Sequence, residues 1–143
     1  TNNMAKEEAA KWFGSAPPDL TLEARLRSPD WIYTYLRSFY IDESRPFGVN
    51  NKVFKDVGMP HVLQDLQGVS TKDEHGNLSP AQGGRLSSEE YDVVIRDLTN
   101  FLEYVGEPNK LERKSLGYWV LAFLFFFFII SYFLKKEYWK DVH

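Results

Sequence analysis

The segment Val57-Gly58-Met59-Pro60-His61 holds the side chain in this sequence that is best suited to bind a redox metal. Met59 is one of two methionines, and it lies between a glycine and a proline rather than on an apolar helical face. Its thioether is a soft ligand that suits haem iron. Glycine lets the backbone approach a flat group closely, and proline restrains the backbone that carries the sulfur. From these residues alone, Met59 is either a ligand or a gap-filling apolar side chain, and His61 is an alternative ligand.

Most other site chemistries find no support in the sequence. There is no cysteine, which excludes disulfides, zinc–thiolate sites and iron–sulfur clusters within these 143 residues. The three histidines are far apart, and no phosphate-binding loop, His-Glu-x-x-His motif or dinucleotide fingerprint occurs. A formal net charge of −3 argues against a nucleic-acid partner. The sequence therefore does not indicate a hydrolase or a conventional metalloenzyme.

Two short helices are predicted before the Met59 segment. The first runs from Asn3 to Phe13 and stops at Gly14. The second is expected from Asp30, as N-cap, to about Tyr40, with an apolar side made of aromatic and aliphatic residues.

A long helix is predicted after the Met59 segment. Ser87 and Glu90 have the spacing of a capping box. Apolar residues then recur at three- and four-residue steps until Gly106 and Pro108 end the helix.

The region between these helices, Ile41 to about Arg85, is rich in glycine, proline and asparagine. A largely irregular segment of this length is unusual in a compact domain unless it wraps something, and a large cofactor is one such thing. The more polar part, Ser70 to Gly84, is expected to be an exposed loop.

The stretch from Leu116 to Leu134 contains no charged residue. As a helix its nineteen residues span roughly 28 Å, which is close to the thickness of a bilayer's hydrocarbon core. Tyrosine and tryptophan flank both ends, as expected at a membrane interface. Lysine and arginine are balanced between the two sides, so charge does not determine the orientation.

Several segments, taken in order, resemble the cytochrome c1 family, in its proteobacterial form. The resemblance covers essentially the whole chain and rests on Trp12-Phe13-Gly14-Ser15-Ala16-Pro17-Pro18-Asp19-Leu20 with Arg25-Leu26-Arg27, on Asp30 to Tyr40, on Asn50-Asn51 through Phe54 to Gly58-Met59-Pro60-His61, on Phe101 to Pro108, and on Lys135-Lys136-Glu137-Tyr138-Trp139.

This resemblance implies roles for individual residues. Met59 would be the axial sulfur ligand of the haem iron, and Arg27 would pair with a haem propionate, with Arg25 as the competing candidate. The residues expected to line the apolar faces of the haem are Pro17, Pro18, Trp31, Leu36, Phe54 and Val57. A core-packing role explains each of these six equally well.

The sequence departs from the family pattern at one point. Family members attach haem c through a C-x-x-C-H motif whose histidine is the other axial ligand, and these residues contain neither that motif nor a histidine before His61. We therefore expect covalent attachment to come from a segment outside this numbering.

The fold expected from the resemblance is mainly α: part of a class I c-type cytochrome domain with long irregular loops, followed by one C-terminal transmembrane helix. Residues 1–107 would belong to a periplasmic haem c domain. Residues 108–143 would form a linker, an anchor at about 116–134 and a short cytoplasmic tail, in a bacterial inner (plasma) membrane.

The function implied is electron transfer within the respiratory ubiquinol–cytochrome c reductase (complex III), with no catalytic residues in this chain. Expected partners are cytochrome b, the Rieske iron–sulfur protein and a soluble or membrane-tethered c-type cytochrome, in a dimeric complex that can join a respiratory supercomplex. The alternative is a cofactor-free single-span accessory subunit that braces a membrane complex.

Overall fold

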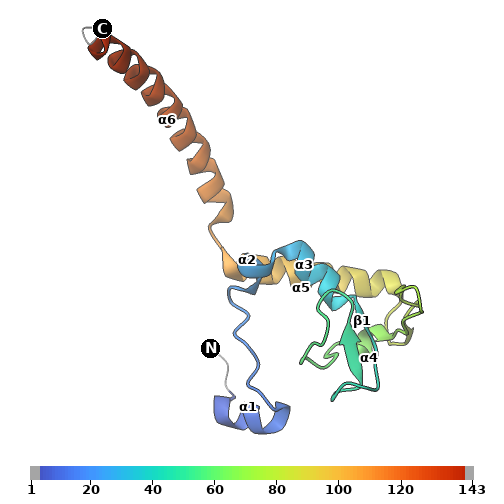
Figure 1. Cartoon of the computed structure of the whole chain (residues 1–143). Coiled ribbons are helices and arrows are strands. Elements are labelled where there is room, and N and C mark those ends of the chain that lie inside the picture. The colour runs from blue at the N-terminus through green and yellow to red at the C-terminus, as the bar shows by residue number, and fades with distance from the viewer. Residues whose placement is uncertain (1–3, 141–143) are drawn as a thin grey trace. The chain divides into compact units, whose positions relative to one another are not determined.

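The computed structural model describes residues 4–140 and divides the chain into two compact units, Thr1–Gly106 and Glu107–His143 (Figure 1). The described part is mostly helical. The first unit contains α1 (Lys6–Phe13), α2 (Glu23–Arg27), α3 (Pro29–Leu36), β1 (Phe39–Ile41), β2 (Val49–Asn51), α4 (Gln64–Gln67), β3 (Gly68–Val69), β4 (Gln82–Gly83) and α5 (Ser88–Gly106), and the second contains α6 (Lys110–Tyr138).

The C-terminal end of α1 and both ends of α5 lie where the local signals place them, whereas α1 begins at Lys6 and the predicted start at Asn3 lies outside the described residues. Gly14 follows α1 in the left-handed conformation, with φ of 77°, which glycine adopts without strain. At the start of α5, the backbone N–H of Ser87 donates to the Glu90 carboxylate at 2.9 Å, and the N–H of Glu90 donates to the Ser87 hydroxyl at 3.2 Å. The predicted capping box is therefore confirmed, and α5 ends at Gly106.

The predicted boundaries of α3 were wrong at both ends. Ser28, not Asp30, is the N-cap, because its hydroxyl accepts from the N–H of Trp31 at 3.3 Å and Pro29 opens the first turn. The helix ends at Leu36 rather than Tyr40. Phe39–Ile41 instead becomes β1, whose backbone pairs with β2 more than seven residues further along the chain. The sequence prediction also missed the five-residue helix α2.

Residues 41–85 are less irregular than expected. β1 and β2 form an antiparallel pair with Phe39 opposite Asn51, and β3 pairs with β4 with Gly68 opposite Gly83. A side chain at Gly68 or Gly84 would collide with the facing backbone, so both glycines are required for this close approach. Within the segment expected to be an exposed loop, most side chains are exposed, although Ser70 is buried.

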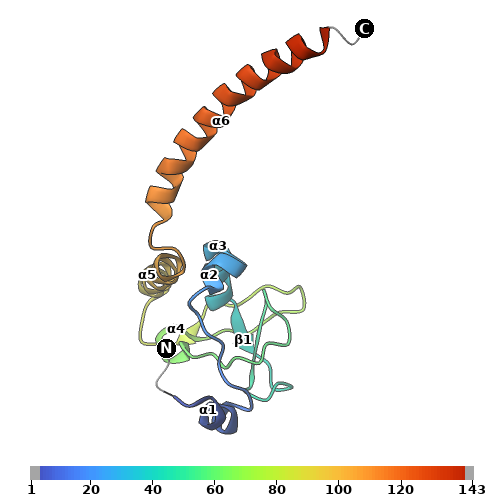
Figure 2. The same cartoon turned by 90° about the vertical axis from the view of Figure 1, so that its left-hand side faces the viewer.

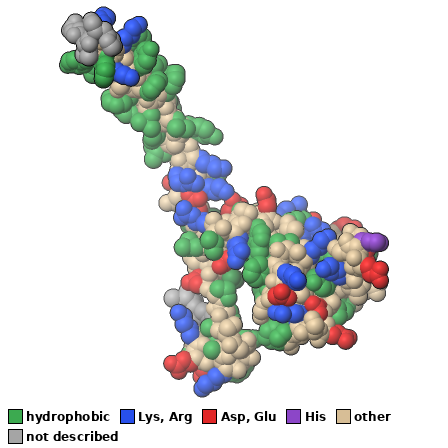
Figure 3. Space-filling model, in the orientation of Figure 1, with side chains coloured by type: hydrophobic (Ala, Val, Ile, Leu, Met, Phe, Trp, Pro, Cys, Tyr) green, Lys and Arg blue, Asp and Glu red, His purple; other side chains and the backbone are tan. Residues whose placement is uncertain are grey.

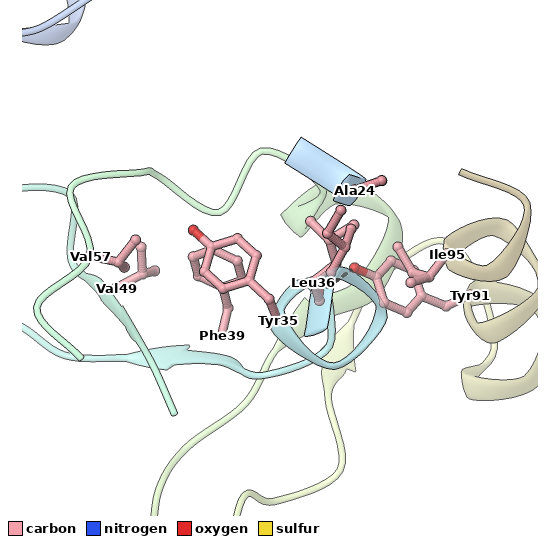
Figure 4. Packing of buried hydrophobic residues seen from close by; sticks show 9 residues of the cluster. Ala24, Tyr35, Leu36, Phe39, Val49, Val57, Tyr91 and Ile95 are labelled. Carbon is pink, nitrogen blue, oxygen red and sulfur yellow. Dashed lines mark hydrogen bonds between the residues drawn. The ribbon is translucent and has the colours of Figure 1, made fainter. Parts of the chain in front are cut away.

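The core of the first unit forms where α3 packs against α5 and the β1–β2 hairpin (Figures 2 and 4). α2 also packs against both α3 and α5. Ile95 of α5 is fully buried, and the hydroxyl of Tyr91 donates to the backbone carbonyl of Leu36 at 2.9 Å. The buried cluster comprises Ala24, Ile32, Tyr35, Leu36, Phe39, Val49, Val57, Tyr91 and Ile95.

The second unit is dominated by α6, the one helix among residues 4–140 that is long and apolar enough to cross a membrane, by its length and composition. Its 29 residues extend beyond the predicted Leu116–Leu134 core at both ends, which gives a length of roughly 43 Å. Apolar side chains cover its middle, while lysines and arginines gather near each end (Figure 3). The expected tail residue His143 lies outside the described residues.

Candidate functional site

Met59 lies in a bend after β2, partly buried against the core. The hydroxyl of Tyr35, on α3, donates a hydrogen bond to the Met59 sulfur at 3.3 Å. Burial raises the pKa of Tyr35 to about 12, so this hydroxyl keeps its proton at neutral pH. The sulfur therefore faces a fixed polar donor, which an ordinary gap-filling methionine does not require.

Two asparagines build the loop that carries Met59. The side-chain carbonyl of Asn51 accepts from the N–H groups of Val53 and Phe54, at 2.9 and 3.2 Å. The side-chain carbonyl of Asn50 accepts from the N–H groups of Asn51 and Asp56, both at 2.9 Å. These four bonds shape loop 52–57, whose first residue, Lys52, also donates its N–H to the backbone carbonyl of Ser38 at 3.0 Å.

The same pair fastens the loop to its neighbours. The amide of Asn51 donates to the backbone carbonyl of Tyr35 at 2.8 Å, so this side chain links the end of α3 to β2. The amide of Asn50 donates to the Asp42 carboxylate at 2.9 Å. Both asparagines are buried, and Asn51 is only 1% exposed. The segment from Asn50 to His61 is one of those that resemble the family named above. Nothing in the local sequence, however, indicates that the two asparagine side chains are buried.

Arg27 contacts two aromatic rings, one of which, Phe54, belongs to the loop that carries Met59. The guanidinium of Arg27 lies 4.8 Å from the ring centroid of Trp31 and 5.3 Å from that of Phe54. The two rings meet edge to face, with centroids 6.3 Å apart. Trp31 in turn stacks on Tyr35 at 4.8 Å, with ring planes 10° apart. The predicted residues Arg27, Trp31, Phe54 and Met59 thus form one cluster around Tyr35.

The other predicted lining residues lie in different settings. Leu36 and Val57 are buried in the core of this chain, where they already have apolar neighbours. Pro17 and Pro18 are exposed, in the extended segment between α1 and α2. Arg25, the alternative to Arg27, has no contact with the rings of Trp31 or Phe54 among those found for residues 4–140, which favours Arg27 as the cation of this cluster.

His61 is held away from solvent. Its ring stacks on Phe39 with centroids 4.8 Å apart and planes within 2° of parallel. Burial is the main reason that the pKa of His61 lies below its usual value, so the imidazole is neutral at pH 7. This packing anchors the chain just after Pro60. It leaves Met59, rather than His61, as the stronger candidate for a metal ligand.

Gly58 leaves one side of the Met59 loop open. A side chain built at Gly58 would meet no atom within 4 Å, and its φ is not in the left-handed region. Neither the packing nor the backbone conformation of this chain therefore requires glycine here. An exposed aromatic ring at Phe54, the open backbone of Gly58 and a thioether fit one face of a flat, apolar, iron-containing group such as haem.

The sequence also matches a known protein family. A family model described as "Cytochrome C1 family" matches residues 1–142. The chain belongs to the cytochrome c1 family. The resemblance predicted from the sequence motifs is thereby confirmed.

Individual relatives agree with the family assignment. A cytochrome c1 of Allochromatium vinosum is 56% identical across the whole chain, which covers 63% of that protein. A protein named ammonia monooxygenase gamma subunit, from Nitrosomonas europaea, is 50% identical over 98% of the chain and 60% of its own length. A cytochrome b/c1 of Bradyrhizobium diazoefficiens is 33% identical over 91% of the chain and 21% of its length. The chain thus spans about six tenths of the first two relatives.

Sequence reasoning missed the part of Tyr35 in the cluster around Met59. The sequence pattern indicates only that Tyr35 belongs to the apolar side of the helix predicted from Asp30, and its contact with Met59 joins positions 24 residues apart. A buried tyrosine usually finds a hydrogen-bond partner, which is the one signal that could have prompted a search for its acceptor.

Proposed function

We propose that this chain is the methionine-ligand part of the haem subunit of a ubiquinol–cytochrome c reductase. In this role the subunit receives one electron from a Rieske iron–sulfur protein and passes it to a soluble or membrane-tethered c-type cytochrome. Bound haem c supplies the one-electron chemistry, and the protein supplies ligation, burial and charge. The chain itself is then an electron carrier within an oxidoreductase, without catalytic residues.

The observation that carries this proposal is the cluster around Met59. Its thioether is held by the Tyr35 hydroxyl, beside a guanidinium that rests on two aromatic rings. In the proposed site Met59 would supply the sulfur ligand of the haem iron, and Arg27 would neutralise a propionate. Trp31 and Phe54 keep water from the ligand side, with support from the buried Leu36 and Val57.

The domain organisation proposed for the whole subunit follows the family. Residues 1–107 would belong to a class I c-type domain on the periplasmic side, and α6 would anchor it to the inner membrane with the C-terminus in the cytoplasm. Pro17 and Pro18 are exposed in this chain and would lie against haem or the haem-attachment segment. The thioether links cannot form within these residues because they contain no cysteine. Cytochrome b would be the membrane partner in a dimeric complex.

The test is the substitution Met59→Leu in the complete haem-loaded subunit. Leucine nearly conserves the volume but removes the sulfur donor, so the iron should become high-spin or recruit another ligand, and the reduction potential should fall. Visible absorption and a redox titration measure both effects. Met4→Leu, the same change at the only other methionine, is the matched control and should leave spectrum and potential unchanged.

An unchanged spectrum in Met59→Leu would move the ligand elsewhere. Absence of haem from the purified subunit, by haem staining and intact mass, would favour the accessory-subunit alternative.

A further inference from the structure

The hydroxyl of Tyr35 is not needed for packing. The ring stacks on Trp31 and meets Phe39 edge to face at 5.2 Å, and phenylalanine would make both contacts equally well. The hydroxyl adds one interaction, the 3.3 Å bond that it donates to the Met59 sulfur. Sulfur is a weak acceptor, so a buried hydroxyl directed at it gains little stability compared with one directed at a carbonyl. The bond is therefore better explained by an effect on the sulfur.

Tyr35 is also rigidly placed. Trp31 and Phe39 restrict its ring from a face and an edge, and the amide of Asn51 holds its backbone carbonyl at 2.8 Å. Asn51 simultaneously shapes the loop that leads to Met59. Donor and acceptor are therefore positioned by one shared residue, which keeps the hydroxyl on the sulfur without reorganisation.

We propose that Tyr35 is a positioning residue that tunes the Met59 sulfur as an iron ligand and raises the reduction potential of the haem. This inference rests on the proposed role of Met59. A thioether sulfur has two lone pairs, so it can donate one to iron and accept the hydroxyl proton with the other.

The direction of the effect follows from electron density. A proton held against the second lone pair withdraws density from sulfur, which then donates less to the iron. The oxidised iron carries the greater positive charge and loses more from this weakened donation than the reduced iron. The Tyr35 hydroxyl thus favours the reduced state. In haem proteins generally, hydrogen bonds to the iron ligands change the reduction potential.

The experiment compares Tyr35→Phe with Tyr91→Phe in the complete haem-loaded membrane protein. Tyr91 is a matched control, because it is also buried and its hydroxyl also bonds to α3, but to the Leu36 carbonyl. For Tyr35→Phe we expect the equilibrium constant for one-electron reduction to fall about twofold to fivefold, where tenfold corresponds to about 59 mV. The low-spin Met-ligated spectrum should persist. Tyr91→Phe should lower stability without this shift in potential.

A second comparison separates tuning from packing. In a Met59→Leu background, Tyr35→Phe should no longer change the potential, because the acceptor is gone. An effect of equal size in both backgrounds would overturn the proposal, as would a Tyr35→Phe potential equal to that of wild type. Either result, with Met59→Leu still losing the ligand spectrum, leaves the proposed function intact. An unchanged spectrum in Met59→Leu alone would overturn both.

Discussion

Replacing Asn51 with alanine tests whether this side chain holds loop 52–57, which leads to Met59, to the end of α3. The change removes one donated bond, to the Tyr35 carbonyl, and two accepted bonds, from the N–H groups of Val53 and Phe54. Each bond contributes about 0.5–1.5 kcal/mol net. Val53 and Phe54 are partly open to water, which can replace the lost acceptor, whereas the Tyr35 residue is buried.

We therefore expect Asn51→Ala to lower the free energy of unfolding by about 2–4 kcal/mol, from a typical total of about 5–15 kcal/mol. A loss of about 3 kcal/mol would lower the guanidinium midpoint by roughly 0.5–1.5 M, given m-values of about 2–6 kcal/mol per M. The midpoint is measured on the complete subunit in detergent, by circular dichroism and by the visible spectrum.

The matched control is Asn100→Ala, the same change at an exposed position of α5, where alanine should be neutral or slightly stabilising. A midpoint for Asn51→Ala equal to that of Asn100→Ala would refute the reasoning.

The variant Asn51→Asp sharpens this test, because it keeps the acceptors but puts a carboxylate in a site that is 1% exposed. Burial raises the pKa of such a group in the folded state. Its destabilising effect should therefore be full at neutral pH and diminish as the pH falls through that raised pKa. Once protonated, the carboxyl can again donate to the Tyr35 carbonyl.

Three further predictions concern α5 and α6. Ser87→Ala should destabilise the subunit by about 1 kcal/mol in thermal unfolding, because it removes the N-cap; a melting temperature equal to that of wild type would contradict this. Hydrogen bonds from Ser87 hold the pKa of Glu90 below its usual value, so that contribution to stability is present above about pH 4.5 and is lost as the pH falls through the folded-state pKa. Cysteines introduced at Ser87 and Val142 should react with an impermeant thiol reagent from opposite sides of the membrane, and labelling of both from one side would disprove a single crossing.

Local signals predicted the elements whose stabilising contacts are close in sequence. The capping box at Ser87 and Glu90, the stop at Gly14 and the apolar run of α6 each depend on neighbours within a few residues or on composition alone. The end of α3 depends instead on partners further away. Phe39 and Tyr40 would continue its apolar face, but backbone pairing with Asn51 and Asn50 draws them into β1.

In the candidate site too, some features are indicated by neighbouring residues and others depend on contacts between distant residues. Met59 could be identified as a candidate because its flanking glycine and proline are adjacent in sequence. Its hydroxyl partner on Tyr35 and the bond by which Asn51 holds the end of α3 are contacts across 24 and 16 positions. Such polar contacts carry no periodic signature, so only the folded chain reveals them.

The buried Asn50–Asn51 pair has a consequence for how the site opens. In loop 52–57 the N–H of Lys52 bonds to the backbone carbonyl of Ser38, whereas those of Val53, Phe54 and Asp56 bond to the side chains of Asn50 and Asn51. Those two side chains also fasten the turn after β1 and the end of α3. The loop therefore cannot detach one residue at a time, since losing Asn51 releases the end of α3 as well. Loop and helix behave as a single cooperative opening unit. The Met59 sulfur and the Tyr35 hydroxyl therefore separate from the core together or not at all, so fluctuations that expose Met59 are as rare as the opening of the whole unit.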